Sequence, residues 1–194
     1  MRATRCLRED HELIAAVLRC FETALIESRT KGAVEAGVFE PFLEFFVGYA
    51  DGQHYEKEEQ CLFACMKRCG INDADEGVKR LLEEHKMSRQ RVELMLSYLD
   101  EAVQGKEFAI EKFYESAGKF RDLILGHIPL ENGHVFRAGD EQIPDSELPA
   151  LEAAYEAMDA SPENAAVRER CLRLGRELIE CWTPKEEEVR TSLL

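Results

Sequence analysis

The sequence lacks the features that mark several classes of protein. No apolar run approaches the roughly 20 residues that a membrane-spanning helix needs. The first residues, MRATRCLREDHEL, contain no apolar signal-peptide core, so we expect a cytoplasmic protein without a membrane partner. Basic residues are outnumbered: 25 Lys and Arg stand against 39 Asp and Glu, a formal net charge of −14. This acidity argues against a nucleic-acid partner, because nucleic-acid backbones are themselves anionic.

The CxxC motif is also absent, although the chain has seven cysteines. An odd number without a secretion signal indicates free thiols rather than a disulfide framework. Cys61, Cys65 and Cys69 follow one another at four-residue spacing. On a helix they would span about 12 Å, so one ion cannot bind all three. We interpret these cysteines as core residues, since a free thiol packs as a small hydrophobe.

Helical periodicity dominates what is present, and no convincing series of strands can be found. Apolar stripes predict four long helices, which should form an all-α, up-and-down antiparallel bundle because their connections are short. The NDAD stretch (72–75) offers capping side chains for the third helix. The inward stripes were expected to include Val47, Leu96 and Val103. The predicted helices begin near residues 8–10, 38, 76 and 108 and end near residues 31, 69, 104 and 138.

Residues 143–194 carry two further helical patterns. The second has Val167, Cys171, Leu174 and Leu178 on one face. Such a face needs a covering surface, which could be the bundle or a second copy of the chain in a homodimer. We therefore divide the chain into a four-helix bundle, residues 1–142, and a C-terminal helical extension, residues 143–194. The final PKEEEVRTSLL is expected to be a solvated end.

Polar residues interrupt the apolar stripes at one height of the predicted bundle. In GQHYEKEEQCLF (52–63), His54 and Glu58 stand one turn apart on the stripe that should face the core. The fourth helix repeats the pattern with His127 and Glu131, and His85 lies on the stripe of the third helix. In an antiparallel bundle these side chains fall near one layer, and His11 joins them if the first helix begins lower.

Buried imidazoles and carboxylates need partners, and their convergence predicts a metal site. Imidazole and carboxylate ligands suit iron, manganese or zinc, whereas the absence of thiolates from the layer disfavours a structural zinc site. The two glutamates are placed to bridge a pair of metals, which would spread their charge over two cations. The predicted metal ligands are His11, His54, Glu58, His85, His127 and Glu131.

Four segments resemble the hemerythrin family in its HHE cation-binding form: EDHELI at His11, HYEKEEQCLF at His54, LLEEHKMSRQ at His85 and HIPLENGHVF at His127. The resemblance spans roughly residues 8–140 and leaves the extension unexplained. It implies a four-helix bundle that holds a non-haem di-iron centre, with the same six residues as ligands. Glu58 and Glu131 would then be the bridging carboxylates.

The sequence departs from the pattern of the oxygen-carrying hemerythrins at two places. In those proteins the third helix has the pattern HxxxH. Here Arg89 stands four residues after His85, at the position of the second histidine. Asn132 occupies the position of their aspartate on the fourth helix, so Glu131 would have to supply the carboxylate. Arg89 is expected either to extend outward or pair with a carboxylate, or to support a bridging glutamate. His134 is expected to cap or orient a neighbour, with ligation as the alternative.

Three functions follow from these features. The first is a di-iron protein that binds or senses a small molecule, such as dioxygen or nitric oxide, or that handles iron. The second is an oxidoreductase that reduces peroxide or nitric oxide with electrons from an external donor, because the sequence contains no flavin, haem or iron–sulfur motif of its own. The third is a zinc-loaded or metal-free helical interaction module.

Overall fold

The computed structural model describes residues 3–72 and 74–183, and helices are the only regular secondary structure in those ranges. The first bundle helix is α1 (Arg5–Lys31). The second is a continuous run of α2 (Ala36–Phe45), η1 (Phe46–Tyr55), η2 (Glu58–Leu62) and α3 (Phe63–Arg68). The third is α4 (Asp75–Val103), and the fourth combines α5 (Glu107–Leu130), η3 (Glu131–Val135) and α6 (Phe136–Gln142). The segments η1, η2 and η3 are π-helical.

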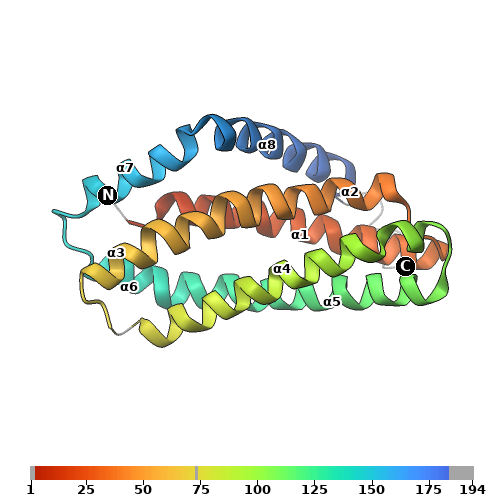
Figure 1. Cartoon of the computed structure of the whole chain (residues 1–194), viewed down its shortest axis with the longest axis horizontal. Coiled ribbons are helices and arrows are strands. Elements are labelled where there is room, and N and C mark those ends of the chain that lie inside the picture. Colours follow the sequence, from red (N-terminus) through yellow and green to blue (C-terminus); the bar gives the residue numbers. More distant parts are fainter. Residues whose placement is uncertain (1–2, 73, 184–194) are drawn as a thin grey trace, which may run out of the picture.

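These four helices run side by side in alternating directions, which confirms the predicted all-α bundle (Figure 1). Glycines stand where three of them end: Gly32, Gly70 and Gly105 have φ values of 70°, 71° and 80°. This left-handed conformation closes a helix and is readily adopted only by glycine. The expected side-chain cap before α4 is not formed by its N-cap residue, which is Ala74.

The apolar core is divided into two clusters. Aromatic residues, among them Phe21, Phe46 and Phe120, dominate the larger cluster. The smaller cluster includes Leu7, Leu62, Leu81, Val135 and Phe136. On each bundle helix the predicted metal-site residues lie close to the boundary between the segment that belongs to one cluster and the segment that belongs to the other. The polar layer is therefore sealed by apolar packing on both sides.

Three residues of the expected inward stripes are solvent-exposed instead: Val47, Leu96 and Val103 keep 47%, 46% and 43% of their surface. Val47 lies in η1, whose wider turn changes the helical register. On α4 the buried row includes Met95 and Ala102 in place of Leu96 and Val103. The expected row and the buried row have every seventh residue in common. A helical repeat in the sequence therefore does not show which of the two rows is buried.

The C-terminal residues form α7 (Leu148–Ala160) and α8 (Pro162–Trp182), which run along the outside of the bundle (Figure 1). Cys171 and Leu178 of α8 are buried in the larger apolar cluster, so the bundle covers the apolar face of this helix. The approach is close: a Cβ added at Gly48 would lie 2.7 Å from the Cys171 Sγ. The expectation for residues 184–194 concerns residues outside the described ranges. No described helix is both long and apolar enough to cross a membrane.

Candidate metal centre

The six predicted ligands come together in one buried layer of the bundle. His54, Glu58, His85 and Glu131 have no exposed surface, and His11 and His127 keep only 2% of theirs. All four bundle helices contribute, through α1, η1, η2, α4, α5 and η3. A lone histidine on an apolar face is normally a satisfied core residue, but four of them facing two glutamates form a candidate ligand set.

The layer consists of two overlapping donor sets, each with all its ligand atoms within 4.8 Å of one another. One set contains His11 and His54, the other contains His85 and His127, and both share Glu58 and Glu131. Oε1 of Glu58 lies 3.0 Å from the His54 Nε2, and its Oε2 lies 3.3 Å from the His85 Nε2. Each oxygen of this carboxylate therefore faces a different set, as a bridging ligand requires.

Glu131 occupies the equivalent position on the fourth helix. Its Oε2 is 3.2 Å from the His11 Nε2 and 3.3 Å from the His127 Nε2. Two ligand atoms that each lie about 2.1 Å from one ion at a right angle are separated by about 3.0 Å. The spacing of the donor atoms is thus that of neighbouring ligands on a shared metal.

The inward atoms of these side chains have no hydrogen-bond partner. The buried atoms without a hydrogen-bond partner are the Nε2 of all four histidines and both carboxylate oxygens of Glu58 and Glu131. Unsatisfied buried polar atoms are costly, so eight in one place point to a ligand. The donor set, neutral imidazole nitrogens with two carboxylates, fits a pair of iron, manganese or zinc ions.

The outward nitrogen of three histidines is hydrogen-bonded. The Nδ1 of His85 lies 2.8 Å from Glu59, the Nδ1 of His127 lies 2.9 Å from Glu84, and the Nδ1 of His11 lies 3.1 Å from the Asn132 side-chain oxygen. The Nδ1 of His54 faces the Asp10 carboxylate at 3.7 Å. Such partners fix the ring orientation, keep the proton on Nδ1 and leave Nε2 free to bind a metal.

Sequence reasoning missed these supporting residues. It assigned no role to Asp10, Glu59 or Glu84. Glu84 is adjacent in sequence to one histidine of the layer but contacts another, His127, across the helix interface. Its position beside His85 is the only local signal that could have identified it, because the pairing depends on how two helices pack.

The π-helical turns place both glutamates. The Phe63 amide donates to the Glu58 carbonyl, and the Phe136 amide donates to the Glu131 carbonyl, five residues back in each case. Pro129 precedes the second of these turns and has no amide to donate to Leu125. A π-turn inserts an extra residue and rotates the following side chains, and such turns are frequent at functional sites.

This rotation accounts for His134, which is exposed and lies outside the layer. The possibility that it is an additional ligand does not fit this position, since its ring packs beside Gly77 on α4. Arg89 pairs with carboxylates, which is one of the roles expected from the sequence. Its Nε donates to Asp51 at 2.6 Å and its Nη2 donates to Glu59 at 3.0 Å, so it supports the residue that holds His85 rather than a bridging glutamate.

A buried ion network connects the layer with the C-terminal helices. Asp10 accepts a hydrogen bond from the Tyr49 hydroxyl at 2.6 Å and lies 3.8 Å from the Lys57 Nζ. Lys57 keeps only 1% of its surface and pairs with Asp159 of α7 at 2.8 Å. Arg168 of α8 reaches Asp10 at 3.6 Å. The extension thus helps to hold the carboxylate that faces His54.

The charges within the layer shift its pKa values strongly. Burial disfavours charged imidazole, yet Glu58 and Asp10 raise the pKa of His54 to about 10. In the same way Glu131 and Glu84 overcome burial and raise the pKa of His127 to about 9. Burial also opposes the Glu58 carboxylate, but His54 and His85 hold its pKa well below the usual range. Without metal, the layer is therefore held by ion pairs between imidazolium and carboxylate.

We expect the stability of chelator-treated protein to fall in alkali. The native state binds these histidine protons more tightly than the unfolded chain, so their contribution is complete below about pH 6.5, the pKa of a free histidine. It is lost as the pH rises through 9 and 10, the raised pKa values of His127 and His54. Urea unfolding across this range measures the effect. A His127→Gln variant should show a flatter profile, and an equally steep one would contradict the assignment.

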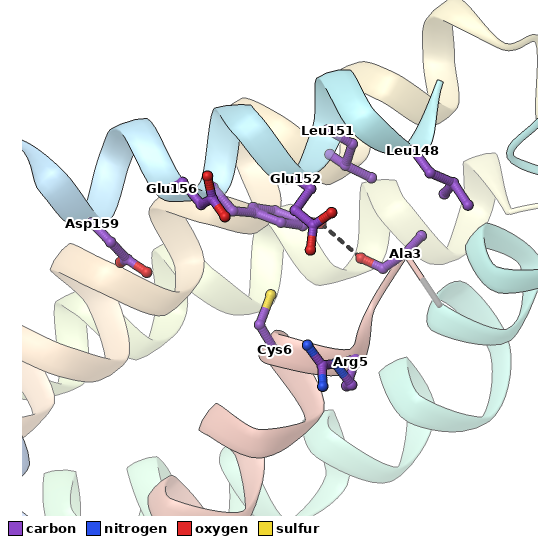
Figure 2. A pocket seen from close by; sticks show the side chains of 9 residues that line it. Ala3, Arg5, Cys6, Leu148, Leu151, Glu152, Glu156 and Asp159 are labelled. Carbon is purple, nitrogen blue, oxygen red and sulfur yellow. Dashed lines mark hydrogen bonds between the residues drawn. The ribbon is translucent and has the colours of Figure 1, made fainter. Parts of the chain in front are cut away.

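Two surface cavities lie near the centre. One, of about 320 Å³, is lined by residues of α1 and of the α5–η3 helix and reaches His11. The other, of about 200 Å³, lies between the start of α1 and α7 and includes Cys6, Glu152 and Asp159 (Figure 2). None of the six layer residues lines the second cavity, whose Asp159 is linked to the centre through Lys57 and Arg168. Of these two cavities, the first is the one that a residue of the layer lines.

A family model described as the hemerythrin HHE cation-binding domain matches residues 2–138. No curated protein and no solved structure gives a significant match. The match covers all four bundle helices up to α6 and every residue of the layer, and it stops before α7. With its helical bundle and its buried histidine and glutamate groups, this chain belongs to the hemerythrin HHE cation-binding family.

Proposed function

We propose that this chain is a non-haem di-iron protein that binds or senses a small molecule such as dioxygen or nitric oxide. The observation that carries the proposal is the set of eight ligand atoms of four histidines and two glutamates that have no hydrogen-bond partner, in a buried polar layer between two apolar clusters. Two imidazoles and two shared carboxylates per ion fit ferrous iron, which retains open coordination positions in sites of this kind. An iron pair would supply redox chemistry and ligand binding there.

The protein's own residues would hold and tune such a pair. Glu58 and Glu131 supply the two shared negative charges, while Glu59 and Glu84 increase the basicity of the imidazoles that they contact. Aromatic rings exclude water on two sides. Tyr55 stacks on His85 with ring centroids 3.8 Å apart, and Phe136 stacks on His11 at 5.1 Å. The cavity beside His11 would admit a diatomic molecule.

Binding or sensing is favoured over turnover because it needs no source of electrons, and the sequence contains no flavin, haem or iron–sulfur motif. A reductase of peroxide or nitric oxide, the alternative function considered from the sequence, would need an external electron donor. Zinc in place of iron would bind to the same ligands but would supply no redox chemistry. A count of the bound metal together with an absorption spectrum therefore distinguishes zinc from iron.

An anaerobic ferrous titration followed by admission of air tests the proposal. We expect two iron ions per chain, and new absorption bands of the oxidised pair once air is admitted. His54→Ala and Glu131→Ala should lose these bands, whereas His134→Ala, which changes an exposed histidine outside the layer, should keep them. A native protein that binds one ion or none, with an unchanged spectrum, would refute the di-iron proposal. Nitric oxide and peroxide can then be added to the reduced protein to identify the ligand.

A further inference from the structure

A second group of potential ligands lies outside the histidine layer, where the second bundle helix ends. Cys65 and Cys69 close that helix, and Glu147 immediately precedes α7. Their ligand atoms, two sulfurs and a carboxylate oxygen, all lie within 4.8 Å of one another. The Cys65 side chain is fully buried, and Cys69 and Glu147 are half-buried. Both cysteines are free thiols.

Helix geometry brings the two thiols together, because residues four apart lie on the same face. Cys61 stands one turn earlier in the same row but is used differently. Its Sγ lies 3.2 Å from the Met158 sulfur of α7. The row of three cysteines is therefore divided, and only its last two members meet Glu147. This division agrees with the length of the row, which is too great for one ion.

The surroundings of the two thiols favour a cation. A helix ends here, and the C-terminal end of a helix carries partial negative charge. Two thiolates with one carboxylate match the ligands of zinc, which lies about 2.3 Å from sulfur and about 2.0 to 2.2 Å from carboxylate oxygen. Neighbouring ligands on such an ion lie roughly 3.5 to 3.8 Å apart, so a small closure of the three side chains would complete the shell. Half-exposed Cys69 and Glu147 leave a fourth position for water.

We propose that Cys65, Cys69 and Glu147 form a binding site for a thiophilic divalent cation of the zinc class, separate from the histidine layer. The two sites differ in chemistry, since thiolates select softer ions than the imidazole and carboxylate set does. The cation would join the end of α3 to the start of α7. It would thus fasten the C-terminal extension to the bundle at the end opposite to the contact between α8 and α2.

Cobalt titration of chelator-treated protein tests this site, because thiolate ligands give Co²⁺ an intense near-ultraviolet charge-transfer band that imidazole and carboxylate ligands do not give. We expect the band in the wild type and its loss in Cys65→Ser and in Cys69→Ser. Glu147→Gln should lower the affinity for Co²⁺ without removing the band. Cys61→Ser is the matched control, since it removes the thiol of the same row that faces Met158, and it should keep the band.

Glu131→Ala separates this proposal from the di-iron one, because it should abolish iron binding at the histidine layer and leave the thiolate band unchanged. No band in natively helical wild type with excess Co²⁺ would overturn the proposal, and so would a band that survives in Cys69→Ser. Cys69 is only half-buried, so Cys69→Ser should fold. The test can then be made with this variant even if Cys65→Ser fails to fold.

Discussion

Replacement of Glu58 by glutamine is expected to abolish binding of the iron pair. Glu58 is the carboxylate whose oxygens face both donor sets, at 3.0 Å from the His54 Nε2 and 3.3 Å from the His85 Nε2. Glutamine has nearly the same shape but no charge, so each ion loses a shared anionic ligand. We expect bound iron to fall from two ions per chain to none at concentrations that saturate the wild type, measured by metal analysis after gel filtration.

A graded result from other variants would strengthen this assignment. His85→Ala damages only one donor set, so it should retain one iron ion bound by His11, His54 and the two glutamates. Glu83→Gln is the matched control, because Glu83 lies close to His85 in sequence but its side chain is 69% exposed and pairs with Lys86. It should keep both ions. Two bound irons in Glu58→Gln would show that this carboxylate is not a shared ligand.

Lys57→Met is expected to destabilise the protein by about 3 to 5 kcal/mol, since removal of one partner leaves buried charges unpaired. Lys57 is almost fully buried and pairs with Asp159 at 2.8 Å and with Asp10 at 3.8 Å. Methionine matches the length of the aliphatic chain, so lost charge rather than lost volume dominates. The free energy of unfolding from urea denaturation of the chelator-treated protein gives the value, and a melting temperature lower by about 10 °C should accompany it.

The control for this change is Lys79→Met, which removes a lysine that is 68% exposed and pairs with Glu76. Surface pairs contribute little, so the free energy of unfolding should stay close to that of the wild type. The double variant Lys57→Met with Asp159→Asn should cost less than the two single changes added together, because each alone already breaks the pair. An equal effect of the two lysine variants would show that the buried network contributes no more than a surface pair.

The helices could be predicted from the sequence because each rule that they obey is local. Apolar residues recur at helical spacing over four long segments, and glycines 32, 70 and 105 stop three of them. The polar layer could be predicted as well. Two histidines each precede a glutamate by one turn on an apolar face, and such groups cannot be buried without a shared partner. Their heights in an antiparallel bundle then follow from the rise per residue.

The rotation of the helices could not be predicted in the same way. On α4 the rows through Leu96 and Met95 both repeat every seven residues, and only packing against α5 selects the second. The π-turns of η1 and η3 shift the register where no residue type signals it, which is why Val47 and His134 are exposed rather than buried. A helical repeat assumes a constant turn, and an inserted residue breaks that assumption.

The sequence by itself determined the helical fold, the family and the residues that meet in the buried layer, because helical periodicity and polar residues on apolar faces are local patterns. Only the tertiary structure decided which oxygen of Glu58 faces which histidine, which side chain faces each Nδ1, and that the apolar face of α8 lies on the bundle. These contacts join residues distant in the chain, such as Lys57 with Asp159 and Glu84 with His127. They depend on distances and rotations between helices, which packing fixes only when the whole chain is folded.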